Sequence, residues 1–248
     1  MRRNPEGRDS PLAGLLERTV APLRKGLEAG PPGLRVVDVG RVLSVGKGVA
    51  RVAGLPEVGS EEMVAFQGGV QGLAQNLDPE GVGVVLLGDE EEVEAGTEVR
   101  ETGRVVEVPV GEEVLGRVLD PVGRPLDGEG PLRASRRRPV EQAAPAIMER
   151  GPVRVPLQTG LKVVDALVPV GRGQRELVVG DRQTGKTSVA VDTIINQRGK
   201  DVACVYCAVG QRSTSVARAR AELRSRSALD HTALTVAGAE DPPAPQYL

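Results

Sequence analysis

Eight consecutive residues carry side chains of the types, and at the spacing, that bind a chain of phosphates. They are Gly180, Asp181, Arg182, Gln183, Thr184, Gly185, Lys186 and Thr187, which match the pattern G-x-x-x-x-G-K-[ST]. The two glycines let the backbone turn so that its N–H groups point inward toward an anion. Lys186 supplies a compact charge for the β- and γ-phosphates, and the Thr187 hydroxyl is placed to ligate Mg²⁺. The motif therefore predicts a site for ATP and Mg²⁺, with Thr187 as the metal ligand.

The segments on either side of the motif have the pattern that such a loop requires. Residues 176–179 are largely apolar and β-branched, which predicts a buried strand before the loop. Residues 186–197 predict a helix after it, and Gly199 follows where helices commonly end. The residues expected on the inner face of this helix are Val189, Ala190 and Ile194. The N-terminus of the helix adds free donors and partial positive charge, both of which favour a phosphate.

The composition argues against several other classes of protein. Lys and Arg number 32 and Asp and Glu 34, so the 248-residue chain lacks the basic excess of a nucleic-acid-binding domain. The three aromatic residues are too few to form a stacking platform for single-stranded nucleic acid. No run of 18 apolar residues predicts a membrane-spanning helix, and no apolar segment after Arg2 and Arg3 predicts a secretory signal.

The cysteines and the single histidine predict no metal or redox chemistry. Cys204 and Cys207 lie in an apolar run, residues 202–209, that predicts a strand. Their offset of three places them on opposite faces of the strand, and no second pair completes a zinc site. We therefore expect buried, inert thiols. His231 has no nearby serine–carboxylate pattern and is expected to lie in a loop or to cap a helix.

Hydrophobic patterning divides the chain into three parts. Residues 1–33 carry apolar residues at roughly helical spacing, interrupted by Pro22, and are expected to form an N-terminal helix or tail, either folded back on the body or docking to a partner. Residues 34–107 contain short β-rich runs separated by turn formers, which predicts a small six-stranded β-barrel. Residues 108–248 are expected to form an α/β phosphate-loop (RecA-like) nucleotide domain. The barrel runs are 36–45, 49–52, 62–66, 70–77, 82–87 and 98–106.

Within the third part, further elements are expected on both sides of the motif. Residues 159–167 and 213–229 predict helices, and residues 232–237 predict a strand. The basic run Arg136-Arg137-Arg138 before Pro139 is expected to be an exposed loop.

Several segments closely resemble the alpha subunit of the F-type rotary ATP synthase, over roughly residues 34–248. The four residues inside the phosphate motif, Asp181-Arg182-Gln183-Thr184, carry the resemblance most specifically. Further matching segments are Gly40–Gly46, Asn76–Asp78, Gln158–Lys162 and Val168–Leu177. The looser match of residues 1–33 leaves open the alternative, second-copy type of ATP synthase.

The resemblance implies a subunit that holds Mg·ATP without turning it over. Gln211 follows the strand where catalytic beta subunits carry a glutamate that polarises the attacking water. The implied partners are beta-type subunits in an alternating hexamer and the central and peripheral stalks, with no nucleic acid. The complex couples ion transport to ATP synthesis or hydrolysis, and the subunit is expected at the cytoplasmic face of the membrane, peripheral and in only indirect contact with it.

The resemblance also implies a truncated nucleotide domain. In the family, the magnesium-side aspartate, the arginine that serves the neighbouring site, the adenine-pocket residues and a helical C-terminal domain lie beyond the position of Leu248. Two rival functions stay open at this point. One is a remnant acting only as an assembly module, and the other is a hexameric nucleic-acid translocase, which RNA-stimulated ATPase activity would reveal.

Overall fold

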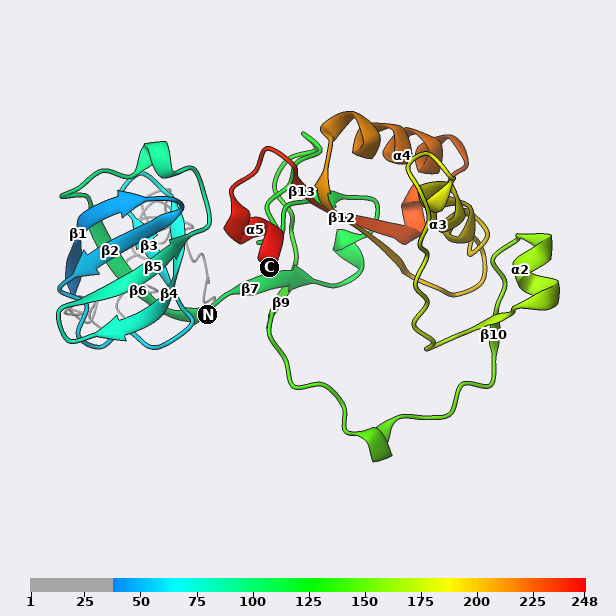
Figure 1. Ribbon diagram of the computed structural model, residues 1–248, viewed down its shortest axis with the longest axis horizontal. Helices are drawn as coiled ribbons and strands as arrows, with labels where there is room; N and C mark the ends of the chain where they lie inside the picture. The colour runs from blue at the N-terminus through cyan, green and yellow to red at the C-terminus, as the bar shows by residue number, and fades with distance from the viewer. Residues whose placement is uncertain (1–37) are drawn as a thin grey trace, which may run out of the picture. The chain divides into compact units, whose positions relative to one another are not determined.

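A computed structural model describes residues 38–248, in which a closed barrel is followed along the chain by an α/β segment (Figure 1). The expectations for residues 1–33 lie outside the described residues. The barrel strands are β1 (Val39–Gly46), β2 (Val49–Ala53), β3 (Glu62–Phe66), β4 (Gln71–Asp78), β5 (Gly81–Leu86) and β6 (Glu98–Val105). They pair antiparallel in the order β1-β2-β5-β4-β3-β6, and β6 pairs with β1 to close the ring. The predicted six-stranded barrel is therefore confirmed.

The barrel closes around an apolar core because its strands alternate inward and outward side chains. The fully buried residues include Val52, Val64, Val84, Leu86 and Val99, with the single phenylalanine, Phe66, beside them. A side chain at Gly72 of β4 would overlap the side chains of Val84 and Phe66, so the filled interior requires glycine there.

The segment after the barrel contains short strands and four helices. Its strands are β7 (Glu107–Val110), β8 (Val118–Leu119), β9 (Arg136–Pro139), β10 (Pro156–Leu157), β11 (Val170–Gly171), β12 (Cys204–Gln211) and β13 (Thr232–Gly238). Its helices are α2 (Lys162–Leu167), α3 (Lys186–Ile195), α4 (Ser213–Ser225) and α5 (Pro243–Tyr247). Single 3₁₀ turns lie at Glu90–Glu92, Glu112–Val114, Ile147–Glu149 and Leu229–His231. None of the helices within residues 38–248 has the length and apolar character needed to cross a membrane.

The basic run at residues 136–138 is exposed, as expected, but the prediction of a loop is wrong. It forms β9, which pairs antiparallel with β7. Arg137 donates a hydrogen bond of 2.7 Å from Nη2 to the carbonyl oxygen of Glu107, so the long side chain lies along its partner strand. Backbone pairing across the two strands overrides the turn-forming character of the following proline, which sits at the strand's end.

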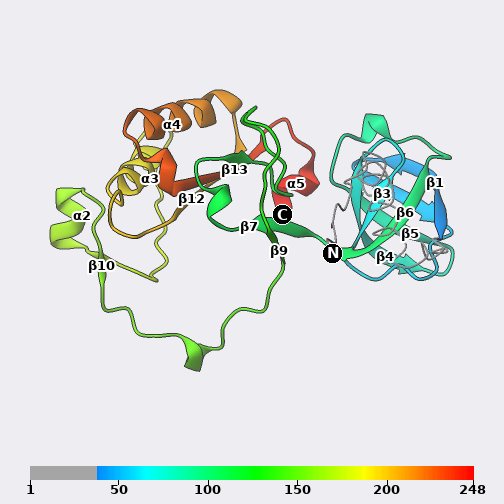
Figure 2. The same ribbon diagram turned by 180° about the vertical axis from the view of Figure 1, so that it is seen from behind.

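A second core lies under the three-stranded parallel sheet β12-β13-β8, where α3 and α4 pack against one face (Figures 1 and 2). Tyr206 and Leu234 point from the strands into this core. The predicted helix over 213–229 is confirmed as α4, which buries Val216, Ala219 and Leu223, but its predicted end is too late. The helix stops at Ser225, and Ser227 beyond it takes a left-handed φ of 53°.

The opposite face of β12 is open, which corrects the expectation of two buried cysteines. Cys207 is exposed together with Val205 and Val209, whereas Cys204 is half-buried on the covered face. The prediction of opposite faces is thus confirmed, but only one of those faces is packed within residues 38–248. Burial raises the pKa of the Cys204 thiol, which favours its protonated and unreactive form.

A buried ion pair fixes the turn-rich segment between β8 and β9. The Arg117 guanidinium contacts the Asp127 carboxylate through two hydrogen bonds, Nε to Oδ2 at 2.7 Å and Nη2 to Oδ1 at 3.0 Å. Asp127 Oδ2 also accepts from the Val118 backbone at 3.0 Å, and Oδ1 accepts from the Glu129 backbone at 3.0 Å. The carboxylate is therefore saturated with donors, which is what a buried charge requires.

Within residues 38–248 we expect trypsin to cut first between residues 141 and 155, because every residue of this segment is exposed and it contains only one short 3₁₀ turn. Arg150 and Arg154 are the sites in question. Arg51 and Arg100 are matched controls, because their side chains are also exposed but their backbones are paired within barrel strands. Limited proteolysis with mass spectrometry should then leave a resistant barrel fragment. A fragment containing Lys186 that outlasts the barrel would contradict this expectation.

Candidate functional site

The predicted phosphate motif forms an exposed turn that leads directly into α3. Gly185 is the N-cap of this helix and takes a left-handed φ of 93°, and Gln183 is also left-handed with a φ of 65°. Left-handed residues within a turn allow successive backbone N–H groups to converge into a concavity for an anion. Gly180 to Gly185 are exposed, so these donors open to solvent at the positive end of the α3 dipole.

The Lys186 side chain folds back over the turn that precedes it. Its Nζ donates to the carbonyl oxygens of Gly180 at 2.5 Å and of Asp181 at 2.6 Å. The Thr184 hydroxyl donates to the same Asp181 oxygen at 2.9 Å. The ammonium therefore holds the two ends of the loop together while retaining donor capacity for an anionic oxygen. Thr187 follows in the first turn of α3 with an exposed side chain, so its hydroxyl is accessible to a metal ion at the same end of the helix.

The strand predicted before the loop is wrong. Residues 176–179 form no strand, and Leu177 is 85% exposed and Val179 79% exposed. A parallel strand with such apolar residues needs hydrogen-bonded neighbours and covered faces. Within residues 38–248 no strand pairs with this segment, so its apolar character does not suffice to form the element.

The loop is instead connected to a small polar scaffold that the sequence analysis missed. The Asp165 carboxylate of α2 accepts hydrogen bonds from the Thr159 backbone, the Thr159 hydroxyl and the Gly160 backbone, at 2.9, 2.6 and 2.9 Å. These bonds, chiefly the one from the Thr159 hydroxyl, lower the pKa of Asp165 and keep it ionised. The upstream strand β10 pairs with β11, so residues 156–171 form a closed turn that includes α2.

Gln211 lies at the carboxyl end of β12, immediately before α4. Gly210 takes a left-handed φ of 63°, and the register with β13 shifts between Val209 and Gln211. The Gln211 carbonyl oxygen accepts a 3.1 Å hydrogen bond from the Ala239 backbone. The carboxyl ends of parallel strands are where ligands of α/β sheets bind. No contact described between residues 38 and 248 joins Gln211 to the phosphate motif itself.

His231 has a structural position, as the sequence predicts. Its Nε2 lies 3.1 Å from the carbonyl oxygen of Ile194, one of the last carbonyls of α3. The residue therefore caps the C-terminal end of the helix that carries the phosphate motif. Among the described residues, no three His, Cys, Asp or Glu side chains lie close enough together to hold a metal ion.

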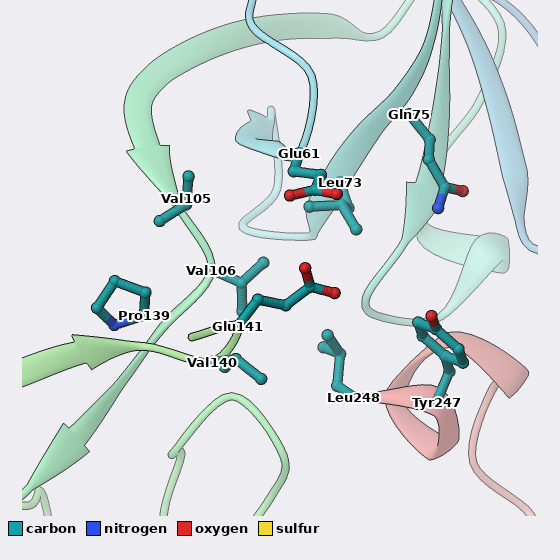
Figure 3. A pocket seen from close by; sticks show the side chains of 10 residues that line it. All are labelled: Glu61, Leu73, Gln75, Val105, Val106, Pro139, Val140, Glu141, Tyr247 and Leu248. Atoms are coloured by element: carbon teal, nitrogen blue, oxygen red, sulfur yellow. The ribbon is translucent and has the colours of Figure 1, made fainter. Parts of the chain in front are cut away.

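A small cavity of about 150 Å³ is lined by residues that all lie outside the phosphate motif (Figure 3). Apolar side chains including Leu73, Val106 and Leu248 line it, with Glu61 and Glu141 also in the wall. None of residues 180–187 contributes to this cavity, and its two carboxylates do not suit a phosphate. The candidate site is therefore the loop at the start of α3.

A closed six-stranded barrel followed by a phosphate loop defines a class of nucleotide-binding subunit, and comparison with known proteins gives the family. Residues 36–103 match the ATP synthase alpha/beta family, beta-barrel domain, and residues 160–248 match the ATP synthase alpha/beta family, nucleotide-binding domain. The chain belongs to the ATP synthase alpha/beta family.

Curated relatives agree with this assignment. The chain is 56% identical over 237 residues to ATP synthase subunit alpha 2 of Polaromonas naphthalenivorans, covering 96% of this chain and 46% of the relative. It is 49% identical over 237 residues to ATP synthase subunit alpha 1 of Marinomonas sp., again covering 96% and 46%. With ATP synthase subunit alpha 2 of Syntrophus aciditrophicus, 51% identity extends over 244 residues, 98% of this chain and 47% of the relative. The chain thus spans about half the length of the curated relatives it matches.

Proposed function

We propose that this chain is an alpha-type subunit of a rotary ATP synthase and that residues 180–187 bind ATP together with Mg²⁺. The observation that carries the proposal is the position of Lys186, whose ammonium group lies over the carbonyls of Gly180 and Asp181 at the N-terminus of α3. A cationic donor, Lys186, and a helix N-terminus meet there on an exposed turn, which is an arrangement that suits a polyphosphate.

Each part of the loop has its own role in this proposal. The backbone N–H groups from Asp181 to Gly185 surround the phosphates, and Lys186 contacts the β- and γ-phosphates. The Thr187 hydroxyl provides one oxygen ligand to Mg²⁺, a cation that prefers oxygen and keeps several waters. A Mg²⁺ ion held there would supply positive charge that offsets the charge of the phosphate oxygens. Arg182, Gln183 and Thr184 complete the wall of the turn.

We propose further that the bound nucleotide is not hydrolysed. The carboxyl end of β12, where the catalytic beta subunits of the family that the chain resembles carry a glutamate, carries Gln211. A glutamine amide is uncharged and does not accept a proton at neutral pH, so it is a poor general base. The site then serves to hold nucleotide and to stabilise the subunit by binding its folded form.

The names of the relatives support a place in a larger assembly. We propose that the chain alternates with beta-type catalytic subunits in a hexamer and contacts central and peripheral stalk subunits. The assembled machine couples ion transport across a membrane to ATP synthesis or hydrolysis, and this subunit is peripheral at the cytoplasmic face and binds no nucleic acid. We also propose the divisions 1–33, 34–107 and 108–248 as an N-terminal segment, the barrel domain and the nucleotide-binding domain.

Lys186→Ala is expected to weaken Mg·ATP binding by about tenfold to a hundredfold, because a charge-assisted contact to phosphate contributes about 1.5–3 kcal/mol. Isothermal titration calorimetry on the purified 248-residue chain measures this effect directly. Lys162→Ala is the matched control, because Lys162 is an exposed lysine at the first residue of α2. Equal affinity of the wild type and the Lys186→Ala variant would overturn the proposed site.

A further inference from the structure

The C-terminal end of α3 is joined to a distant part of the chain by two side-chain amides. Asn196 Nδ2 donates to the carbonyl oxygens of Thr159 at 3.0 Å and Asp192 at 2.9 Å. Gln197 Nε2 donates to the carbonyl oxygens of Gln158 at 2.8 Å and Thr193 at 2.9 Å. Each amide therefore binds one carbonyl of its own helix and one of the segment before α2.

The segment that receives these amides is itself held in place from the other side. Thr159 is only 4% exposed and Gln197 only 3%, so one residue on each side of the junction is buried, whereas Asn196 is exposed. The Asp165 carboxylate binds Thr159 and Gly160 through the three hydrogen bonds described above. Gly160 has a left-handed φ of 81°, and a Cβ there would overlap the Asn196 side chain. The close fit at this point requires both the glycine and the amide.

These five residues, Thr159, Gly160, Asp165, Asn196 and Gln197, form what we call the latch. The latch joins the chain before α2 to the end of α3, and the covalent chain between these two points includes the phosphate loop. On the downstream side, the loop is separated from the latch by α3 alone, a rigid rod of ten residues and about 15 Å. On the upstream side, residues 172–179 connect the loop to the closed turn of β10, α2 and β11.

We propose that the latch positions the phosphate loop for its ligand, with Asn196 and Asp165 as the principal positioning residues. This inference rests on the proposed nucleotide-binding function. The latch fixes the rotation and translation of α3 relative to the turn at Thr159, and so fixes where the N-terminus of α3 and Lys186 meet the other end of the loop at Gly180. Residues 176–179 form no strand within residues 38–248, so no sheet pairing restrains the loop from upstream, and the latch is a restraint that ties the preceding segment to α3.

Energetic coupling between two sites is reciprocal, so the latch and the ligand stabilise each other. An open latch leaves α3 attached to the sheet through its buried face, which includes Val191, and through the contact of His231 with the Ile194 carbonyl. The loop then samples more conformations, and binding must restrict them at a cost in affinity. The latch acts through the geometry of the phosphate loop. Its loss therefore weakens binding of the polyphosphate part of the ligand, and the effect is the same whether or not the ligand carries an adenine ring.

Asn196→Asp is the sharpest test, because it removes the two amide donors with almost no change in volume. We expect the dissociation constants of Mg·ATP and of magnesium tripolyphosphate to rise together by about five- to twentyfold. Asn76→Asp, on the exposed end of β4, is the matched control and should leave both constants unchanged. Asp165→Asn opens the latch from α2, without touching α3, and should have the same effect. All measurements are made on the full chain well below its unfolding temperature.

Hydrogen–deuterium exchange without nucleotide distinguishes positioning from a purely structural role. We expect Asn196→Asp and Asp165→Asn to speed amide exchange in residues 180–187 by at least about fivefold, while exchange in β12 and β13 stays at the wild-type rate. If the wild type binds Mg·ATP, Lys186→Ala abolishes binding, and both latch variants bind and exchange as the wild type does, the latch inference is overturned and the proposed function stands. If the wild type binds no nucleotide, the proposed function fails, and exchange in residues 180–187 alone then decides the latch.

Discussion

Replacing Asp127 with alanine is expected to destabilise the α/β segment by about 3 kcal/mol, because it leaves a largely buried guanidinium without its counter-ion and with only the Gly130 carbonyl as acceptor. The Asp127 side chain is 0% exposed and that of Arg117 14% exposed. The substitution also leaves the backbone N–H groups of Val118 and Glu129 without their acceptor. Arg117 belongs to the strand region that pairs with β13, so the loss reaches the core of the parallel sheet.

Urea unfolding monitored by tyrosine fluorescence measures this loss of stability in the α/β segment itself. Tyr206 is buried in the same core cluster as Val118, and the chain has no tryptophan and no tyrosine in the barrel. The matched control is Glu80→Ala, because Glu80 pairs with Arg51 at 3.6 Å on the exposed surface of the barrel. An exposed pair contributes about 0–1 kcal/mol, so a loss at Asp127 no larger than this would contradict the expectation.

The same ion pair makes stability depend on pH in a defined direction. The hydrogen bond from Arg117, together with those from the backbone of Glu129 and Val118, holds the pKa of Asp127 far below its usual range. A carboxyl whose pKa is depressed by folding contributes its full stabilisation above its unfolded pKa of about 4, and loses it as the pH falls toward the folded value. Wild-type stability should therefore fall below about pH 4, and Asp127→Asn should remove this part of the fall.

The second large effect concerns turnover: the chain alone should release no phosphate from Mg·ATP above the rate of its Lys186→Ala variant. A general base typically contributes about 10²–10⁴-fold to such a reaction, and Gln211 supplies none. The Gln211→Glu substitution supplies only the missing base. Phosphoryl transfer also needs a full magnesium coordination and a cation that stabilises the transition state. We therefore expect no measurable turnover in that variant either.

A coupled phosphate-release assay on the wild type, Gln211→Glu and Lys186→Ala decides the matter. The Gln211→Glu variant should still bind nucleotide in calorimetry, which shows that the absence of turnover does not arise from an empty site. Turnover in the wild type that disappears in Lys186→Ala would show that the site is catalytic, and the proposed alpha-type role would then be wrong.

The barrel was predictable from the sequence because the alternation of inward and outward side chains can be recognised within each short strand. Alternating residues such as Val82 and Val84 in β5 point inward, and Gly and Asp separate the strands, so each strand is visible within its own few residues. The helices α3 and α4 were visible for the same reason. The assignment of Ala190 to the inner face of α3 is wrong, because Val191 is the residue buried there and Ala190 is exposed.

Features that depend on distant partners were not predictable in the same way. The phosphate motif gave the loop and Lys186, but the latch depends on Asn196 meeting a carbonyl 37 positions earlier, which no short pattern records. Residues 176–179 illustrate the opposite case. Their composition suits a strand, but within residues 38–248 no neighbouring strand pairs with them, so no strand forms. Arg117 and Asp127 are likewise ordinary surface residue types that only the fold brings together and buries.

The closed pairing of the barrel has a consequence for the order in which the chain acquires structure during synthesis. Every strand pairing of the barrel joins residues between Val39 and Val105, including the β1–β6 pairing that closes it. Small barrels dominated by non-local pairings fold in about milliseconds to seconds, whereas a ribosome adds about 5–20 residues per second. The ring can therefore close while most of the α/β segment has yet to be translated. The phosphate loop would then emerge beside a finished domain that offers it no unpaired strand edge.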